Sequence, residues 1–242
     1  MLIFVYLQPQ EKPTMTMDTV QPIIYSPGLG MRPYMSDKKY TNEFSPLIEF
    51  KKGDKESYSD YTTSIAKFLK SYKNASDFTI KDCHSDKKSS CPVKLSRLGP
   101  CSGLSDKSYG YDSGKPCVLL KINKIYGWKP EAYDKSPYKK LGSHWSTNSI
   151  AVHCQKYEVH GDGSDAKNPS WSVELHPPDG FPFSCFPFCN KQKYVAPLIM
   201  AQFKNLPPDE EVNVWCRAFA KNIQLDKRDR AGAVRFTLRL NS

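Results

Sequence analysis

Cysteine provides the most distinctive chemistry in this 242-residue chain. The chain contains eight cysteines, an even number that is typical of a protein forming disulfides in an oxidising compartment. Zinc sites usually repeat closely spaced ligand pairs, and only Cys185 and Cys189 approach such a spacing here. The sequence therefore favours disulfides over zinc. The eight residues are Cys83, Cys91, Cys101, Cys117, Cys154, Cys185, Cys189 and Cys216.

The other reactive residues form no recognisable catalytic pattern. Residues 161–165 superficially resemble a glycine-rich phosphate loop, but they lack the Lys-Ser/Thr pair of a P-loop and are better interpreted as a hairpin turn. The histidines lack metalloprotease spacing, and they are His84, His144, His153, His160 and His176. We therefore expect a protein that is not an enzyme and has no cofactor, metal site or small-molecule substrate.

The chain is basic, with a formal net charge of +10 from 35 Lys and Arg against 25 Asp and Glu. Nucleic-acid-binding proteins often concentrate such an excess in one stripe. Here the lysines are scattered, and no helix-turn-helix, zinc-finger or RNP-like pattern accompanies them. We expect a solvated basic surface and no nucleic-acid partner.

The elements that must position the cysteines are mostly strands. Residues 118–122 are a largely apolar run, and alternate residues share one face in 150–154, 212–218 and 234–240. The regular alternation of helices and strands that builds parallel sheets is absent. The pattern predicts a mainly β fold, an antiparallel sandwich with one flanking helix.

That helix is expected at about residues 58–72. Ser57 and Asp60 form a start resembling a capping box. The apolar residues that follow share one helical face, which we expect to pack on the domain. They are Tyr61, Ile65, Phe68, Leu69 and Tyr72.

The strand faces predict one disulfide. Cys154 and Cys216 lie on the apolar faces of their strands, where opposed sheets could bring them together. Closing this loop of roughly 60 residues would stabilise the fold by roughly 4 kcal/mol on the chain-entropy model. Eight cysteines allow about 105 complete pairings, so spacing alone leaves the others open.

The amino-terminal region differs from the rest. Residues 1–7 are apolar but much shorter than the about 20 residues of a membrane-spanning helix, and we expect them to be the outer end of a truncated transmembrane helix. Repeated prolines and a Pro-Gly-Leu-Gly turn predict an extended juxtamembrane stalk over residues 8–55. We expect residues 56–242 to form the extracellular β-sandwich domain.

One long segment carries a family resemblance. It contains Leu-Gly-Pro-Cys-Ser-Gly-Leu at 98–104, Tyr-Gly-Tyr at 109–111 and Gly-Lys-Pro-Cys at 114–117, and it continues to Pro130. It resembles the signature of the beta subunits of sodium/potassium- and hydrogen/potassium-transporting ATPases. Further matching segments are residues 27–33, which look invertebrate-like, 68–73, 194–203 and 214–223.

The resemblance implies an immunoglobulin-like, disulfide-stapled fold and a non-catalytic role in sodium and potassium transport. The partner would be the catalytic alpha subunit of a P-type cation ATPase, whose folding, membrane delivery and cation affinity the chain would assist. The location would be the plasma membrane, single-pass type II with an extracellular C-terminal domain. The alternative is a pump-independent adhesion or junction protein using the same ectodomain.

The resemblance also implies particular residues. By position, the family's three disulfides would be Cys83–Cys91, Cys101–Cys117 and Cys154–Cys216, the last agreeing with the strand faces. Where relatives have a tyrosine-rich stretch close to the alpha subunit, this chain has Cys185 and Cys189, which would form a fourth disulfide, with a metal site as the weaker alternative. The alpha-binding residues would be Phe186, Pro187, Phe188, Lys191, Tyr194 and Pro197. Asn74 heads a glycosylation sequon, Asn-Ala-Ser.

Overall fold

The computed structural model describes residues 15–16, 27–33, 40–42, 45–83, 85–139, 141, 145–157, 170–189, 194–224 and 232–242. Several sequence predictions lie outside these residues. They are the membrane-helix end at 1–7, the turn at 161–165, and the residues Lys191, His84, His144 and His160.

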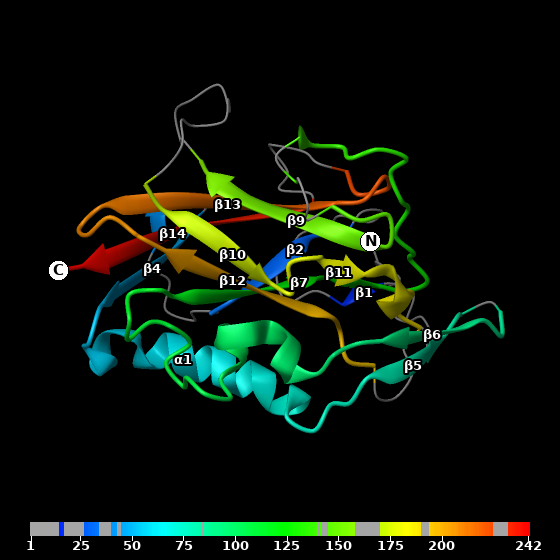
Figure 1. Cartoon of the computed structure of the whole chain (residues 1–242), viewed down its shortest axis with the longest axis horizontal. Coiled ribbons are helices and arrows are strands. Elements are labelled where there is room, and N and C mark those ends of the chain that lie inside the picture. The colour runs from blue at the N-terminus through cyan, green and yellow to red at the C-terminus, as the bar shows by residue number, and fades with distance from the viewer. Residues whose placement is uncertain are drawn as a thin grey trace, which may run out of the picture.

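The mainly β fold is confirmed, and its two larger sheets and one α-helix form three layers (Figure 1). The first layer is a six-stranded sheet, in the order β11 (Phe181–Pro182), β9 (Ser149–Lys156), β13 (Glu211–Phe219), β14 (Ala233–Asn241), β4 (Ser45–Lys51) and β3 (Tyr40–Asn42). The second is a four-stranded sheet, in the order β10 (Ser172–His176), β12 (Leu198–Lys204), β7 (Cys117–Ile122) and β2 (Leu29–Arg32). One pair departs from the expected antiparallel pattern, because β14 and β4 run parallel.

The two central strands of the four-stranded sheet, β7 and β12, are buried on both faces, whereas the edge strand β10 has exposed residues. This explains why β7 and β12 read as nearly continuous apolar runs, whereas an exposed sheet face would require polar residues at alternate positions. Phe203 of β12 contacts Phe236 of β14 edge-on, with 5.7 Å between ring centres, and so joins the two sheets through the core.

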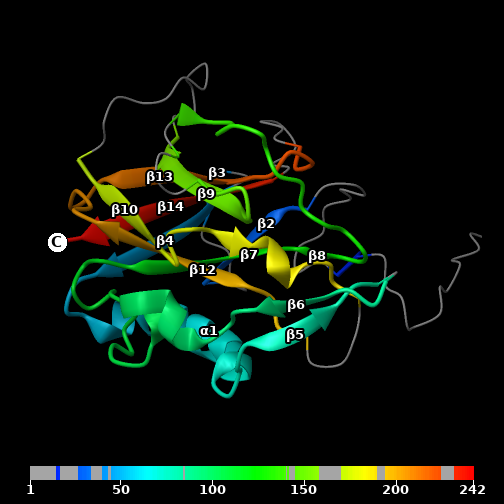
Figure 2. The ribbon, with the colours of Figure 1, turned by 45° about the vertical axis from the view of Figure 1, so that its right-hand side comes forward.

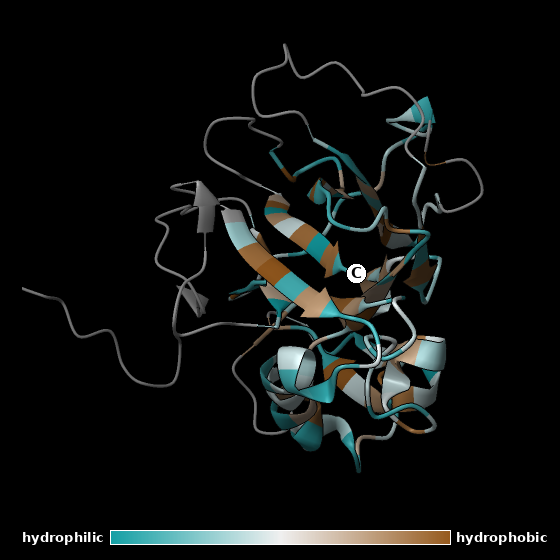
Figure 3. Ribbon diagram, turned by 90° about the vertical axis from the view of Figure 1, so that its left-hand side faces the viewer, coloured by the Kyte–Doolittle hydropathy of each residue, from teal (hydrophilic) through white to brown (hydrophobic). Residues whose placement is uncertain are grey.

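The predicted helix is present as α1 (Lys55–Leu69), followed by the 3-10 turn η1 (Lys70–Tyr72). It begins earlier than expected because Asp54, rather than Ser57, caps it and accepts a hydrogen bond from the Glu56 amide. The buried face is close to the expected one and consists of Tyr58, Tyr61, Ile65, Leu69 and Tyr72. Figure 3 shows hydrophilic residues along much of the helical surface.

Part of the segment expected as a stalk belongs to the sheets. Strand β2 pairs with β7, strand β4 pairs with β14, and β1 (Met15–Thr16) pairs with β8 (Lys124–Ile125). The prolines misled the interpretation here, since Pro33 follows β2 and Pro46 lies near the start of β4, both positions that strands tolerate. The β sandwich therefore includes strands that precede residue 56.

A small hairpin projects from one end of the sandwich (Figure 2). It consists of β5 (Phe78–Lys81) and β6 (Lys88–Cys91), paired antiparallel. Two 3-10 turns complete the described elements that matter for the site, η2 (Leu95–Ser102) and η4 (Phe183–Cys185). Within the described part of the chain, the helices are all too short or too polar to span a membrane.

Candidate functional site

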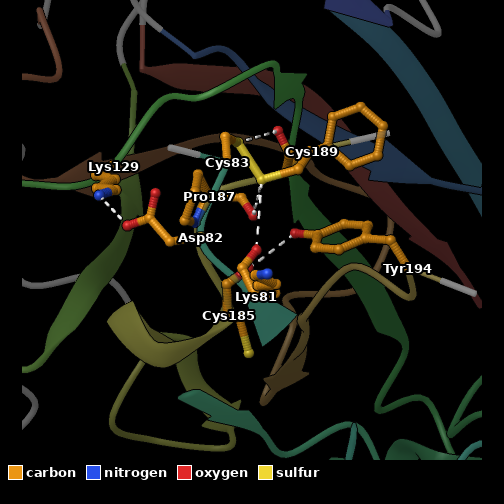
Figure 4. Close-up of a disulfide and its surroundings, with 9 residues drawn as sticks. Lys81, Asp82, Cys83, Lys129, Cys185, Pro187, Cys189 and Tyr194 are labelled. Atoms are coloured by element: carbon orange, nitrogen blue, oxygen red, sulfur yellow. Dashed lines mark hydrogen bonds and ion pairs between the residues drawn. A yellow bond between two sulfur atoms is a disulfide. The ribbon is translucent and has the colours of Figure 1, made fainter. Parts of the chain in front are cut away.

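The segment of residues 183–189, called here the clamped segment, is attached by two disulfides to the β5–β6 hairpin (Figure 4). Cys185 pairs with Cys91 at a Cα–Cα distance of 4.6 Å. Cys189 pairs with Cys83 at 5.4 Å. Since the two cysteines flank Phe186, Pro187 and Phe188, this short aromatic stretch is held at both ends.

These pairs correct two expectations, Cys83–Cys91 and Cys185–Cys189. In the hairpin, Cys91 lies opposite Phe78, five positions before Cys83. At about 3.3 Å per strand residue this places the Cys83 and Cys91 Cα atoms about 16 Å apart if β5 continues its course, well beyond the about 7 Å limit for a disulfide. Because the hairpin cysteines engage Cys185 and Cys189 separately, neither a short-loop disulfide nor a metal site forms there.

The remaining two disulfides join the expected residues. Cys101 pairs with Cys117, and Cys154 pairs with Cys216. The second pair differs from expectation in its setting, because both residues belong to the six-stranded sheet and lie directly opposite each other across β9 and β13. The structure thus places all eight cysteines in disulfides.

Phe186 and Phe188 of the clamped segment contact aromatic rings and one lysine from other parts of the chain. Phe186 contacts the Trp128 ring edge-on at 5.5 Å between centres. Phe188 is 6% exposed and contacts the Tyr194 ring at 5.0 Å. The Lys124 ammonium lies over both of these rings, 5.2 Å from the centre of Phe188 and 5.3 Å from that of Tyr194.

Backbone hydrogen bonds fix the same residues. The Gly127 amide donates to the Phe188 carbonyl oxygen at 2.9 Å, and Tyr126 and Phe188 form an isolated parallel bridge. The Tyr194 hydroxyl donates to the Cys185 carbonyl oxygen at 3.1 Å. Burial, and to a smaller extent Tyr72, raises the pKa of the Tyr194 hydroxyl well above its usual range, so it stays protonated and remains a donor at neutral pH.

Charged groups beside the outer end of the clamped segment are partly neutralised. Asp82, which is 8% exposed, pairs with the Lys129 ammonium. Lys81 pairs with Asp86 across the hairpin turn. The Lys124 ammonium lies over the Phe188 and Tyr194 rings and so places a positive charge next to the aromatic surface.

The structure brings together some of the expected partner-binding residues. Phe186, Pro187, Phe188 and Tyr194 form one group, whereas Pro197 is buried apart and lines a small pocket with Tyr72 and Val93. Three contributors were not assigned a role from sequence: Lys124, Tyr126 and Trp128. They lie in the segment that carries the family resemblance, which was the available signal.

The sequon asparagine lies away from this group. Asn74 is exposed and lies two residues after the end of η1. The Tyr72 hydroxyl, two residues earlier, donates to the Ala196 carbonyl oxygen at 3.0 Å. This bond anchors the end of η1 to the residues that lead into β12. Asn74 is therefore accessible on a firmly held backbone.

Comparison with known proteins gives a consistent result. A family model described as sodium/potassium ATPase beta chain matches residues 1–236. Sodium/potassium-transporting ATPase subunit beta-1 of Drosophila melanogaster is 34% identical over 232 residues, covering 89% of this chain and 71% of the relative. Subunit beta-2 of the same organism is 30% identical, covering 88% and 70%. A probable subunit beta-3 of Caenorhabditis briggsae is 29% identical, covering 88% and 65%.

Proposed function

The chain belongs to the sodium/potassium ATPase beta chain family, and from this premise we propose that it binds a catalytic alpha subunit through the clamped segment and Tyr194. Members of this family are accessory subunits rather than enzymes, and they partner the catalytic alpha subunit. The observation that carries the proposal is that disulfides hold the stretch from Phe186 to Phe188 at both of its ends.

The composition of the site supports this proposal. Aromatic residues are enriched at protein interfaces and dominate the energetic hot spots within them. Phe186 and Tyr194 are partly exposed, while Phe188, which contacts the Tyr194 ring, is buried. A segment held in its bound conformation loses less entropy on association, which increases its affinity.

The same proposal includes a cellular role. The subunit would assist folding of the alpha subunit, its delivery to the plasma membrane and its cation affinity, with the sandwich on the extracellular side. Four disulfides are consistent with that compartment.

Co-purification tests the partnership. The full chain is co-expressed with an alpha subunit from the same organism, and the membranes are solubilised in a mild detergent. We expect the alpha subunit to co-purify with the chain, and Phe186→Ala to reduce the recovered amount. Leu104→Ala is the matched control, because Leu104 is 60% exposed and lies on the loop after η2.

Two results would contradict the proposal. One is the absence of any alpha subunit in the purified sample, and the other is an equal recovery with Phe186→Ala and wild type. Absence of the alpha subunit together with chain-dependent aggregation of cells would instead favour the adhesion role.

A further inference from the structure

The two disulfides of the clamped segment differ in burial. The inner disulfide, Cys91–Cys185, has both residues fully buried, at 0% exposure. The outer disulfide, Cys83–Cys189, has both residues partly exposed. Thiol–disulfide exchange requires a thiolate to reach a sulfur atom, so access is a main determinant of its rate. The outer disulfide is therefore open to reagents that cannot reach the inner one.

The outer disulfide lies next to the backbone that positions Phe188. The Cys83 Sγ atom is 3.7 Å from the Phe188 carbonyl oxygen, and the Cys189 Sγ atom is 3.5 Å from the Lys81 carbonyl oxygen (Figure 4). The same Phe188 carbonyl accepts the Gly127 amide. Breaking the outer disulfide removes the covalent restraint at the carboxyl-terminal end of the clamped segment, while Cys91–Cys185 still holds the stretch at Cys185.

We propose that Cys83–Cys189 is a redox modification site that takes a dithiol as its co-reactant and controls binding of the alpha subunit. The control of alpha-subunit binding rests on the proposed function, whereas the redox site itself does not. Cys189 occupies a stretch where the family resemblance leads one to expect tyrosines.

The reaction is a two-electron exchange. One thiolate of the dithiol attacks the Cys83 or Cys189 sulfur, breaking the S–S bond and forming a mixed disulfide. The second thiol of the reagent then displaces the remaining chain sulfur and closes the reagent's own disulfide. The chain gains two thiols, the dithiol loses two hydrogen atoms, and no other oxidant or reductant is needed.

The consequence is a loss of preorganisation. With the outer disulfide open, Phe188 and Cys189 lose their covalent restraint, and more of their order must be established at the moment of binding. Immobilising one or two such side chains lowers affinity by about tenfold. The fold itself remains intact, because the inner disulfide and the two disulfides of the sandwich are untouched.

The first experiment uses the free full chain and needs no alpha subunit. The chain is treated with increasing dithiothreitol, quenched with a maleimide and mapped by peptide mass spectrometry. We expect Cys83 and Cys189 to be labelled at a dose that leaves the other six cysteines unlabelled. Earlier labelling of Cys91 and Cys185, or labelling of all eight together, would overturn the site.

The second experiment measures alpha-subunit binding before and after the same mild treatment. We expect affinity of the wild type to fall about tenfold, and that of a Cys83→Ser/Cys189→Ser variant to start low and not change on treatment. Equal losses in wild type and variant would assign the effect to another disulfide and overturn the control function. If untreated wild type does not bind at all, the proposed function fails while the labelling order still tests the site.

Discussion

The ammonium group of Lys124 lies 5.2 Å from the centre of the Phe188 ring, and it lies almost as close to the ring of Tyr194. This contact joins the short strand β8 to the clamped segment. The two are far apart in the sequence, and no local pattern predicts that they meet. Because the amide of Gly127 also donates to the Phe188 carbonyl, the stretch that follows β7 forms the platform on which the clamped segment rests.

Replacing Lys124 tests this platform. Lys124→Met keeps the length of the side chain and removes the charge over the two rings, an interaction of about 0.5–1 kcal/mol at a partly exposed site. We expect alpha-subunit affinity to fall about threefold, measured by titrated co-purification. Lys73→Met, at an exposed position after η1, is the control and should bind as wild type. A variant at 124 that binds as tightly as the control would exclude Lys124 from the site.

Removing the cross-strand disulfide should lower stability strongly. Cys154→Ala/Cys216→Ala opens a loop with a sequence separation of 62 residues, and we expect a loss of about 4 kcal/mol in the free energy of unfolding. Cys101→Ala/Cys117→Ala opens a separation of 16 residues and should lose about 1 kcal/mol less. Urea unfolding curves measure both. The reverse order of the two losses would contradict loop closure as the dominant cause.

The protonation of His176 should make stability depend on pH. Burial lowers the pKa of His176 below its ordinary value, and the charge of Lys204 lowers it further. The carboxylate of Glu174, 3.8 Å away, acts in the opposite direction. The unfolded chain therefore binds this proton more readily than the folded one does, so stability falls as the pH drops through and below about 6.5.

The measurement compares unfolding free energies at about pH 7.5 and about pH 5 for wild type and His176→Gln. We expect wild type to lose more stability than the variant over this interval. Gly99 lies against the imidazole, so the replacement must fit the same space. Glutamine is chosen because its side chain is polar and of approximately the same size. Equal losses would show that His176 does not contribute to the pH dependence.

Asn74 should carry a glycan when the chain passes through the secretory pathway. Its side chain is exposed just after η1, where an oligosaccharide would not displace core residues. We expect Asn74→Gln to migrate faster on a denaturing gel by the mass of one glycan, and glycosidase treatment of wild type to abolish the difference. Identical migration of untreated wild type and variant would show that the sequon is unoccupied.

The sequence predicted best where local periodicity and burial agree. The helical stripe of Tyr61, Ile65 and Leu69 was recognisable because the residues fall on one face, and the structure buries all three. Cys154 and Cys216 could likewise be paired from the faces of their strands. Whether they joined two sheets or two strands of one sheet could not be predicted, because both arrangements bury the same faces.

The clamped segment was predicted only in part. Its aromatic residues were found by resemblance, but the pairing of Cys185 and Cys189 depends on where the β5–β6 hairpin lies, a contact between segments about 100 residues apart. The positions of β2 and β4 also depend on distant partners, β7 and β14. Local sequence contains no information about such pairings, and turn residues near these strands concealed them.

Site-specific photo-crosslinking tests most directly whether the clamped segment binds the alpha subunit. A benzophenone amino acid replaces Phe186 in one sample and Leu104 in the other, and membranes containing both subunits are irradiated. We expect an adduct with the mass of one chain plus one alpha subunit from position 186, and none from position 104. No adduct from position 186, or adducts of equal yield from both positions, would contradict the assignment.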